Sequence, residues 1–269
     1  MCGGLSLDNA PRPPYRYVPG ALTPGRSPAT PPVRQGLMQS ISKRKWSALT
    51  QSAGEGNADA QWELGYYLEH GAVTRSGKVL ATPDRSAATG WYLLAAQQDD
   101  AGAKNALSAL LSAGDNPDYK AAIFWAKSAI RQGDASAAYN LGIIYRDLGK
   151  PKAAFGQYQL AAAMGDADAH LQIGLCHLLG QGTAIDHGAA QASLNKVLLA
   201  PSIGTAKRTR EDALYWLALI NLMGLGQRRN LGQAQDMLER TNADDDHEQA
   251  NDILHVIGHA ATRRLRSPV

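Results

Sequence analysis

Two histidines near the C-terminus have a spacing that could bind a metal ion. His255 and His259 lie four residues apart in a segment with helical periodicity, so both imidazoles would project from one side of a helix. No glutamate or cysteine accompanies them at ligand spacing. The segment is better explained as a helix that caps the C-terminal end of the fold, and we expect no metal there.

A second group of possible ligands surrounds the only cysteine in the body of the chain. His170, Cys176, His177 and His187 lie close together in the sequence. His177 falls at a bulky core position of a repeated helical pattern, and Cys176 suits a small buried side chain. The pattern therefore favours a packed helix over a metal or nucleophilic site.

Two glycine-containing tripeptides could be mistaken for phosphate-binding loops. They are Gly-Gln-Gly at residues 180–182 and Gly-Leu-Gly at residues 224–226. Neither follows a strand or ends in Lys-Ser/Thr, so both are interpreted as turns. The sequence thus predicts no catalytic residue, no metal ion and no cofactor.

Composition and charge exclude several further classes of function. Apolar residues make up 44% of the chain but aromatic residues only 6%, which favours helices packed closely through Ala and Leu over a β-sandwich. The formal charge of +3 belongs to residues 1–37, which hold four arginines and one aspartate. Residues 38–269 therefore hold 23 basic and 23 acidic residues. A neutral body does not favour nucleic acid or an anionic membrane as the partner.

Cysteine usage and hydropathy suggest where the protein works. Cys2 and Cys176 are far apart and are not expected to form a structural disulfide, which suits a reducing compartment. No apolar run has the form of a signal peptide or a membrane span. We expect a cytoplasmic protein.

The N-terminal segment differs from the rest of the chain. Residues 1–37 hold eight of the thirteen prolines and are predicted to be disordered. They could be dispensable or could form a short proline-rich recognition tail. The helical body is predicted to span residues 38–264, followed by a tail at 265–269. A first helix is expected to begin at Met38, and Gln39 to Ser52 to form a half-repeat that covers the first unit.

One helical pattern recurs along residues 60–221. Its marker residues are separated by 43, 34, 32 and 44 positions, a period typical of units that bury their apolar face only by stacking. Gly142 and Gly174 directly follow a marker and are expected to lie where a neighbouring helix passes closely. The copies are Ala60-Leu64-Gly65-Leu68, Ala137-Leu141-Gly142-Tyr145, Ala169-Ile173-Gly174-His177 and Ala213-Leu217-Ala218-Asn221, with a degenerate copy Ala103-Leu107-Ser108-Leu111.

Helix ends and partner helices are also visible in the pattern. A glycine followed by Asn or Asp at residues 56–57, 133–134 and 165–166 ends one helix and caps the next. The second helix of each unit combines large rings with alanines, which predicts close packing of rings against small residues. These segments are Ala88-Trp91-Tyr92-Ala95-Ala96, Ala122-Phe124-Trp125-Ala129 and Ala154-Phe155-Tyr158-Ala161-Ala162.

Together these units resemble Sel1-like repeats, which are related to tetratricopeptide repeats. The fourth unit is most similar, with its Gly-Gln-Gly loop at 180–182, Asp186 and Ala189-Ala190. The third has only the short connection 147–151, and the first has an insertion from about Thr74 to Pro83. The resemblance covers roughly residues 38–240. It implies an all-α, right-handed α-solenoid of about five helix pairs with capping helices at both ends, which serves as a non-catalytic binding scaffold.

The resemblance also implies which side chains contact a partner. In tetratricopeptide repeats, positions two before and two after the marker face a concave groove, and the position five after it adds charged residues. A groove rich in Trp, Tyr and aliphatic residues is typical of a protein-binding surface. Alternatively, a tight superhelix would pack these side chains against each other. Carried over, the positions are Trp62, Tyr66, Glu69, Asn105, Ala109, Tyr139, Ile143, Arg146, Leu171, Leu175, Tyr215 and Leu219.

The function expected from this resemblance is binding of a protein partner by a monomer in a bacterial cytoplasm. An adaptor and an immunity protein that neutralises a toxin fit equally well. The alternative is an envelope-associated factor that binds peptidoglycan or another polysaccharide, or an enzyme. An enzyme would need converging polar groups in the groove, and the groove positions are mostly apolar.

Overall fold

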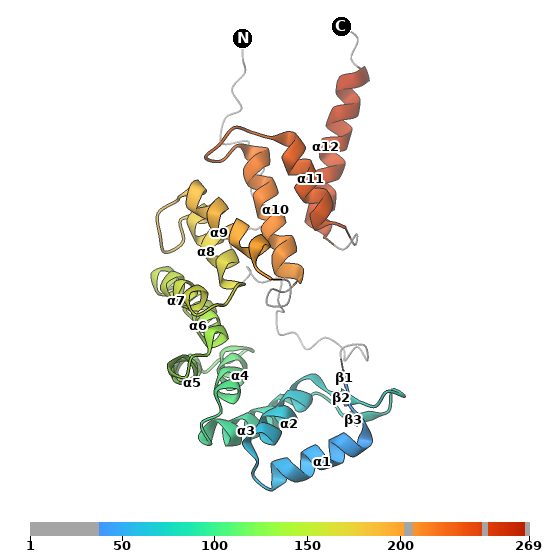
Figure 1. The fold of residues 1–269 in the computed structure, drawn as a ribbon, viewed down its shortest axis with the longest axis vertical. Coiled ribbons are helices and arrows are strands. Elements are labelled where there is room, and N and C mark those ends of the chain that lie inside the picture. Colours follow the sequence, from blue (N-terminus) through green and yellow to red (C-terminus); the bar gives the residue numbers. More distant parts are fainter. Residues whose placement is uncertain (1–37, 202–206, 244–246, 267–269) are drawn as a thin grey trace. The chain divides into compact units, whose positions relative to one another are not determined.

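The computed structural model describes residues 38–201, 207–243 and 247–266, and these form twelve helices and one small sheet (Figure 1). The described residues fall into two compact units, 38–144 and 145–266, and helix α6 contributes to both. The predicted N-terminal segment 1–37 and residues 267–269 of the predicted tail lie outside the described residues.

The first unit consists of a capping helix and successive helix pairs. α2 packs against α1 and α3, and α4 packs against α3 and α5. Two clusters of buried apolar side chains fill this unit, one around Leu64 and one around Leu107. The helices are α1 Lys43–Gly54, α2 Ala58–His70, α3 Arg85–Gln97, α4 Ala101–Ser112, α5 Tyr119–Arg131 and the first part of α6 Ala135–Asp147.

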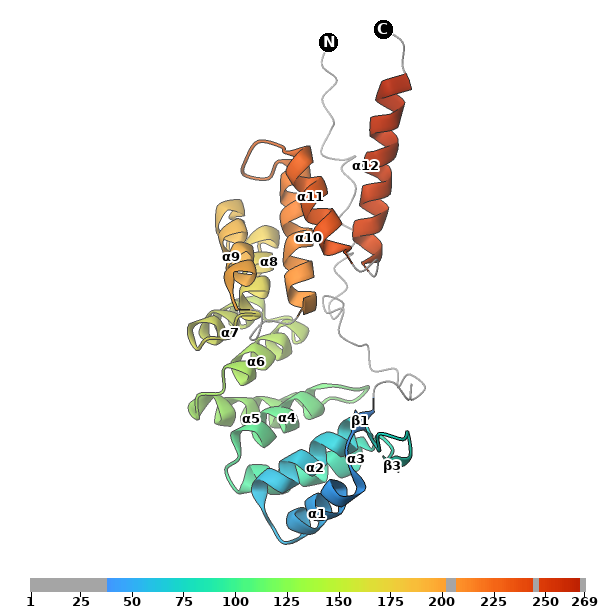
Figure 2. The ribbon, with the colours of Figure 1, turned by 45° about the vertical axis from the view of Figure 1, so that its right-hand side comes forward.

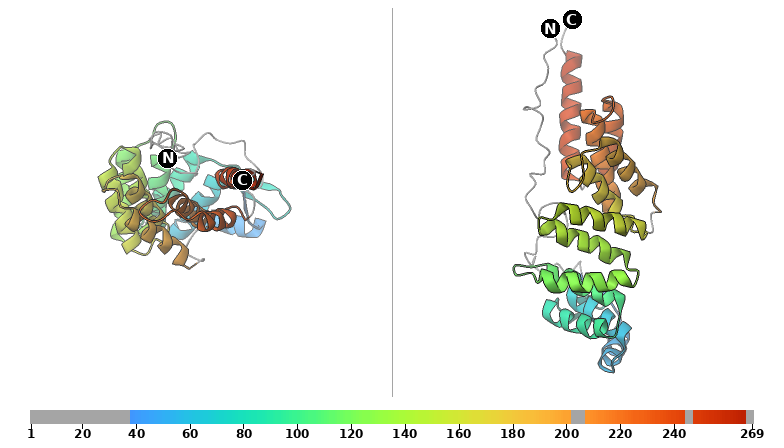
Figure 3. Two further views of the ribbon diagram at one scale, coloured as in Figure 1. Left: turned by 90° about the horizontal axis from the view of Figure 1, so that it is seen from above. Right: turned by 90° about the vertical axis from the view of Figure 1, so that its left-hand side faces the viewer.

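The second unit continues the same arrangement and ends in a second capping helix (Figures 2 and 3). α8 packs against α7 and α9, α10 packs against α9 and α11, and α12 covers α11. The all-α fold of helix pairs capped at both ends is therefore confirmed. The helices are α7 Pro151–Ala163, α8 Ala169–Leu179, α9 His187–Leu199, α10 Lys207–Met223, α11 Leu231–Thr241 and α12 Glu248–Arg266.

The junctions between helix pairs use the predicted chemistry. Gly133 has φ 91°, which a side chain would disfavour, and Asp134 then accepts a 2.9 Å hydrogen bond from the amide of Ala137 at the start of α6. At the junction between α3 and α4, Asp99 takes the place of the glycine and also has a positive φ of 72°. Its carboxylate pairs with Lys104, whose side chain is buried.

A small sheet replaces the helix start that was expected at Met38. Gln39–Ser40 forms β1. The amide of Gln39 donates to the carbonyl of Gly71 at 2.9 Å, and the amide of Ile41, the next residue after β1, donates to that of Val73 at 2.8 Å. β1 runs parallel to β2 (Ala72–Val73), which forms an antiparallel hairpin with β3 (Val79–Ala81) inside the predicted insertion. The prediction was wrong because these backbone groups bond to residues 71–73, just before the insertion, so α1 begins only at Lys43.

Small residues at the repeat glycines allow close helix contacts, as the pattern predicted. A methyl group at Gly174 in α8 would lie 2.9 Å from Cγ of Leu194 in α9. At Gly65 in α2 it would lie 2.8 Å from the ring of Tyr92 in α3. Gly142 is buried in α6. The prediction that Gly174 is a packing residue is thus confirmed.

Candidate functional site

Three rings form a column along one side of α2 in the first unit. Trp62, Tyr66 and His70 follow each other at intervals of four residues, which places them one above the other on a helix. The rings of Trp62 and Tyr66 are stacked with centroids 6.2 Å apart and planes 20° apart. Tyr66 and His70 have centroids 4.4 Å apart. Trp62 is 38% exposed, so this aromatic column offers apolar surface to the solvent.

Hydrogen bonding fixes the polar end of the aromatic column. The Nδ1 atom of His70 lies 2.9 Å from the carbonyl oxygen of Tyr66. A carbonyl oxygen can only accept, so Nδ1 carries the proton in this contact. Nε2 lies at the end of an otherwise apolar column and is a hydrogen-bond acceptor in the neutral form of this tautomer.

The first helices of neighbouring pairs extend the surface beside the aromatic column. The indole Nε1 of Trp62 lies so close to α4 that a methyl group at Gly102 would be 3.2 Å from it. Asn140 in α6 donates a 2.8 Å hydrogen bond from its side chain to Asn105 in α4. Thus α2, α4 and the first part of α6 share one strip of aromatic and amide side chains.

Most of the predicted partner-binding residues of the first unit lie partly exposed. Tyr66, Glu69, Asn105, Tyr139 and Ile143 are half-buried, while Trp62 and Ala109 are exposed.

Glu69 is held in place by a tyrosine of the second helix. It accepts a 2.9 Å hydrogen bond from the hydroxyl of Tyr92. Burial and the neighbouring carboxylate raise the pKa of Tyr92, so its hydroxyl stays protonated and remains a donor. Glu69 is therefore an anchored charge beside the aromatic column.

In the second unit the predicted positions are buried. Leu171, Leu175, Tyr215 and Leu219 belong to one apolar cluster. This matches the alternative in which groove positions of successive repeats pack against each other. Their surface is therefore not offered to a partner in this structure.

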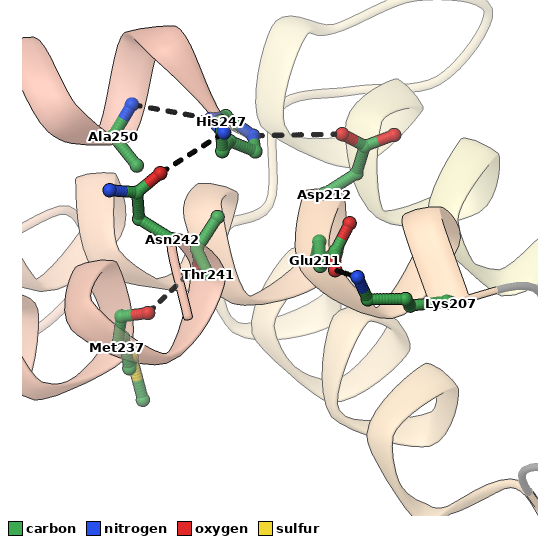
Figure 4. A network of polar contacts seen from close by, with 8 residues as sticks. All are labelled: Lys207, Glu211, Asp212, Met237, Thr241, Asn242, His247 and Ala250. Carbon is green, nitrogen blue, oxygen red and sulfur yellow. Dashed lines mark hydrogen bonds and ion pairs between the residues drawn. The ribbon is translucent and has the colours of Figure 1, made fainter. Parts of the chain in front are cut away.

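A residue from the start of the C-terminal cap helps to bury α10. Tyr215 is 1% exposed, and its ring lies 5.0 Å from the ring of His247. Figure 4 shows how His247 is held: its amide donates to Asn242 at 3.0 Å, and its Nδ1 accepts from the amide of Ala250 at 3.2 Å. Nδ1 accepts, so Nε2 carries the proton and faces Asp212 at 3.9 Å. The predicted groove is closed at this point.

Exposed apolar side chains on α3 and α5 were not expected from the sequence. The sequence pattern predicts that the large rings of the second helices, here Phe124 and Trp125, pack against small residues. Trp125 does pack against the cluster around Leu107, but Phe124 is 59% exposed. Leu93 and Leu94 on α3 are also exposed. His70 was missed as well, although its four-residue spacing from Tyr66 could have indicated it.

Neither a metal site nor a membrane span is found in the described part of the chain. Among the side chains described, those of residues 38–201, 207–243 and 247–257, His, Cys, Asp and Glu do not gather in a group of three or more that could hold a metal ion. No helix in the described ranges is long and apolar enough to cross a bilayer.

Comparison with known proteins agrees with the repeat boundaries. The family model "Sel1 repeat" matches residues 58–100, 101–134, 135–166, 167–192 and 211–242, and the first three matches begin where α2, α4 and α6 begin. No curated protein matches the chain.

Several solved structures are similar to this one. One is a protective antigen present in uropathogenic Escherichia coli strains, which has an SLR fold. It is 28% identical to this chain, with a TM-score of 0.66, and the match covers 80% of this chain. This chain spans only 44% of the length of that antigen. A Sel1 repeat protein from Oxalobacter formigenes is 22% identical with a TM-score of 0.61, covering 78% of this chain and 80% of that one.

Proposed function

Because the chain belongs to the Sel1 repeat family, whose members are generally scaffolds for protein–protein interaction, we propose that it is a non-catalytic binding protein for one protein partner. The partner contacts the aromatic column of α2 and the strip beside it on α4 and α6. The observation that carries this proposal is the exposed, stacked pair Trp62 and Tyr66.

The aromatic column has the properties of a binding hot spot. Tryptophan and tyrosine contribute a large share of the energy of protein interfaces when a partner excludes water from them. Stacking already restricts the rings of Trp62 and Tyr66, so less side-chain entropy is lost on binding. Asn105 and Glu69 supply polar groups at the edge, which favours a partner that combines an apolar centre with hydrogen-bonding groups.

Within this function we propose two roles, an adaptor or a toxin-neutralising immunity protein, in a bacterial cytoplasm. The bacterial source of the similar structures supports the setting. The captured partner distinguishes the roles: an immunity protein binds a protein that is toxic when expressed without it, whereas an adaptor's partner is harmless. Subcellular fractionation of the native host tests the location.

Affinity capture from the native host, followed by mass spectrometry, tests the proposal. The full-length chain should recover one stoichiometric protein partner. Trp62→Ala and Tyr66→Ala should each weaken binding of that partner by about thirty-fold, equivalent to roughly 2 kcal/mol. Their melting temperatures should fall only modestly, because these rings are partly exposed.

Phe124→Ala is the matched control, since it removes a more exposed ring from a second helix of the same unit. This variant should bind the partner normally. Loss of binding in Phe124→Ala with normal binding in Trp62→Ala would place the interface on α5, at the exposed ring of Phe124. Recovery of cell-wall glycan in place of a protein would favour the envelope alternative.

A further inference from the structure

A small cavity lies in the second unit, between the end of α6, α7 and α8. Its volume is about 20 Å³, and its polar lining comes from Arg146, Tyr158, Gln172, Cys176 and Gln181. Pro151 at its edge is exposed, so the cavity lies close to the surface. The space exceeds the roughly 10–15 Å³ that one water needs, but it is too small for a ring or a sugar.

Arg146 is the charged residue of this cavity and is only 9% exposed. Its Nε and Nη2 atoms both donate to one carboxylate oxygen of Asp147, at 3.1 and 3.0 Å. Its Nη1 atom is fully buried, and no described residue provides an acceptor for it. A buried charged donor without an acceptor is costly, so such a group calls for an acceptor from elsewhere.

Comparison with the first repeat shows why Nη1 of Arg146 has no acceptor among the described residues. Glu69 lies five residues after the marker of α2 and accepts from the hydroxyl of Tyr92. In the third repeat, Arg146 and Tyr158 occupy the equivalent sequence positions. The exchange of a carboxylate for a guanidinium therefore places a hydrogen-bond donor where the first repeat has an acceptor.

The other lining groups favour an anionic acceptor. Gln172 and Gln181 can each donate through a side-chain amide. Burial raises the pKa of Cys176 to about 12, so its thiol stays neutral and does not compete as an anion. The charge of Asp147 is more exposed to solvent than that of Arg146, and solvent screens it more strongly.

We propose that this cavity receives one carboxylate group of the protein partner. The carboxylate accepts from Nη1 of Arg146 and from the glutamine amides, and the charge on both partners strengthens these bonds. This contact deepens the proposed partner binding, but it is carried by the cavity and not by the aromatic column. An acidic side chain and a free chain terminus offer the same group.

Nuclear magnetic resonance of the arginine side chains in the full-length protein tests this, with sodium acetate as the probe. Acetate added at constant ionic strength should shift the Nε–H signal of Arg146 saturably, whereas chloride should not. Arg210 is the matched control, because its guanidinium already donates to the carbonyls of Leu198 and Ala200 at 2.8 Å. Its signal should stay unchanged.

Variants and model compounds sharpen the result. Gln172→Leu should weaken acetate binding about tenfold, as expected for one bond to a charged group. N-acetylglycine carries a free terminal carboxylate, whereas N-acetylglutamate α-amide carries an acidic side chain. The compound that binds more tightly shows whether the partner's carboxylate belongs to a chain terminus or to a side chain. Equal shifts with acetate and chloride, or none with any carboxylate, would overturn the proposal and leave the site to a water molecule.

The proposed role of the aromatic column can be rejected independently of the proposed role of the cavity. Trp62→Ala should keep the acetate response of Arg146, because its ring belongs to the other unit. Normal partner capture by Trp62→Ala together with a saturable acetate shift would reject the aromatic column and keep the cavity.

Discussion

Replacing Gly174 by alanine sets two effects of known size against each other. Gly174 lies inside α8, where alanine is more favourable than glycine by about 0.8–1 kcal/mol. The added methyl group, however, would lie 2.9 and 3.0 Å from Cγ and Cδ2 of Leu194 and 3.3 Å from the carbonyl oxygen of Ala190. Such overpacking costs about 1–3 kcal/mol. We therefore expect a net loss of up to about 2 kcal/mol in the free energy of unfolding.

Gly156→Ala separates the two effects. Gly156 lies inside α7, is exposed, and has no atom within 4 Å of the position of an added methyl group. Only the helix preference changes there, so this variant should be stabilised by about 0.8–1 kcal/mol. Thermal melts followed by circular dichroism can resolve the difference, because 1 kcal/mol corresponds to about 2–4 °C in a chain of this size.

Leu194 provides the decisive test of the mechanism. Leu194→Ala removes the atoms that the new methyl group would meet, at its own cost of about 2–5 kcal/mol. In that background, Gly174→Ala should become neutral or stabilising, and the coupling between the two changes measures the clash. A higher melting temperature for Gly174→Ala in the native background would refute the close approach of α8 and α9. It would also refute the repeat alignment that placed a glycine there.

Three further predictions concern ionisable groups. In a Cys2→Ser background, Cys176 should resist a disulfide reagent at pH 8 until the protein is unfolded, because burial raises its pKa to about 12. Asp212→Asn should raise the melting temperature at pH 7: burial raises the pKa of Asp212 above 3.8, so its ionisation costs stability as pH increases through that range. Asp99→Asn should lower the melting temperature at pH 7, because the hydrogen bond from Lys104 lowers the pKa of Asp99 and its stabilising effect is lost only as pH falls. Both Asp variants should approach the parent as the pH falls below the folded-state and unfolded-state pKa values of the replaced carboxyl. A difference in melting temperature that does not change with pH would exclude a charge effect.

Local patterns were sufficient to predict the helix pairs. The marker spacing identifies each first helix, and Gly133-Asp134 identifies a junction, because helix ends depend on residues that are adjacent in the chain. The same logic missed the junction at Asp99, where an aspartate adopts the backbone conformation of the usual glycine. It also failed for Gln39, since a strand of two residues depends on a partner 33 positions later at Ala72, which no local pattern shows.

The candidate site shows a second limit of the repeat pattern. Trp62 and Tyr215 occupy equivalent positions relative to their markers, yet one is exposed and the other is covered by His247. Accessibility depends on what packs across the helix, and the repeat does not encode that.

Glu69 and Arg146 are equivalent in the same way, and their opposite charges are visible in the sequence. This difference in charge becomes informative only when the structure shows that Glu69 accepts a hydrogen bond from Tyr92, whereas Nη1 of Arg146 has no acceptor among the described residues. Positions that follow the repeat build the scaffold, because every copy must pack on its neighbours in the same way. Binding chemistry therefore has to be sought where one copy departs from the others.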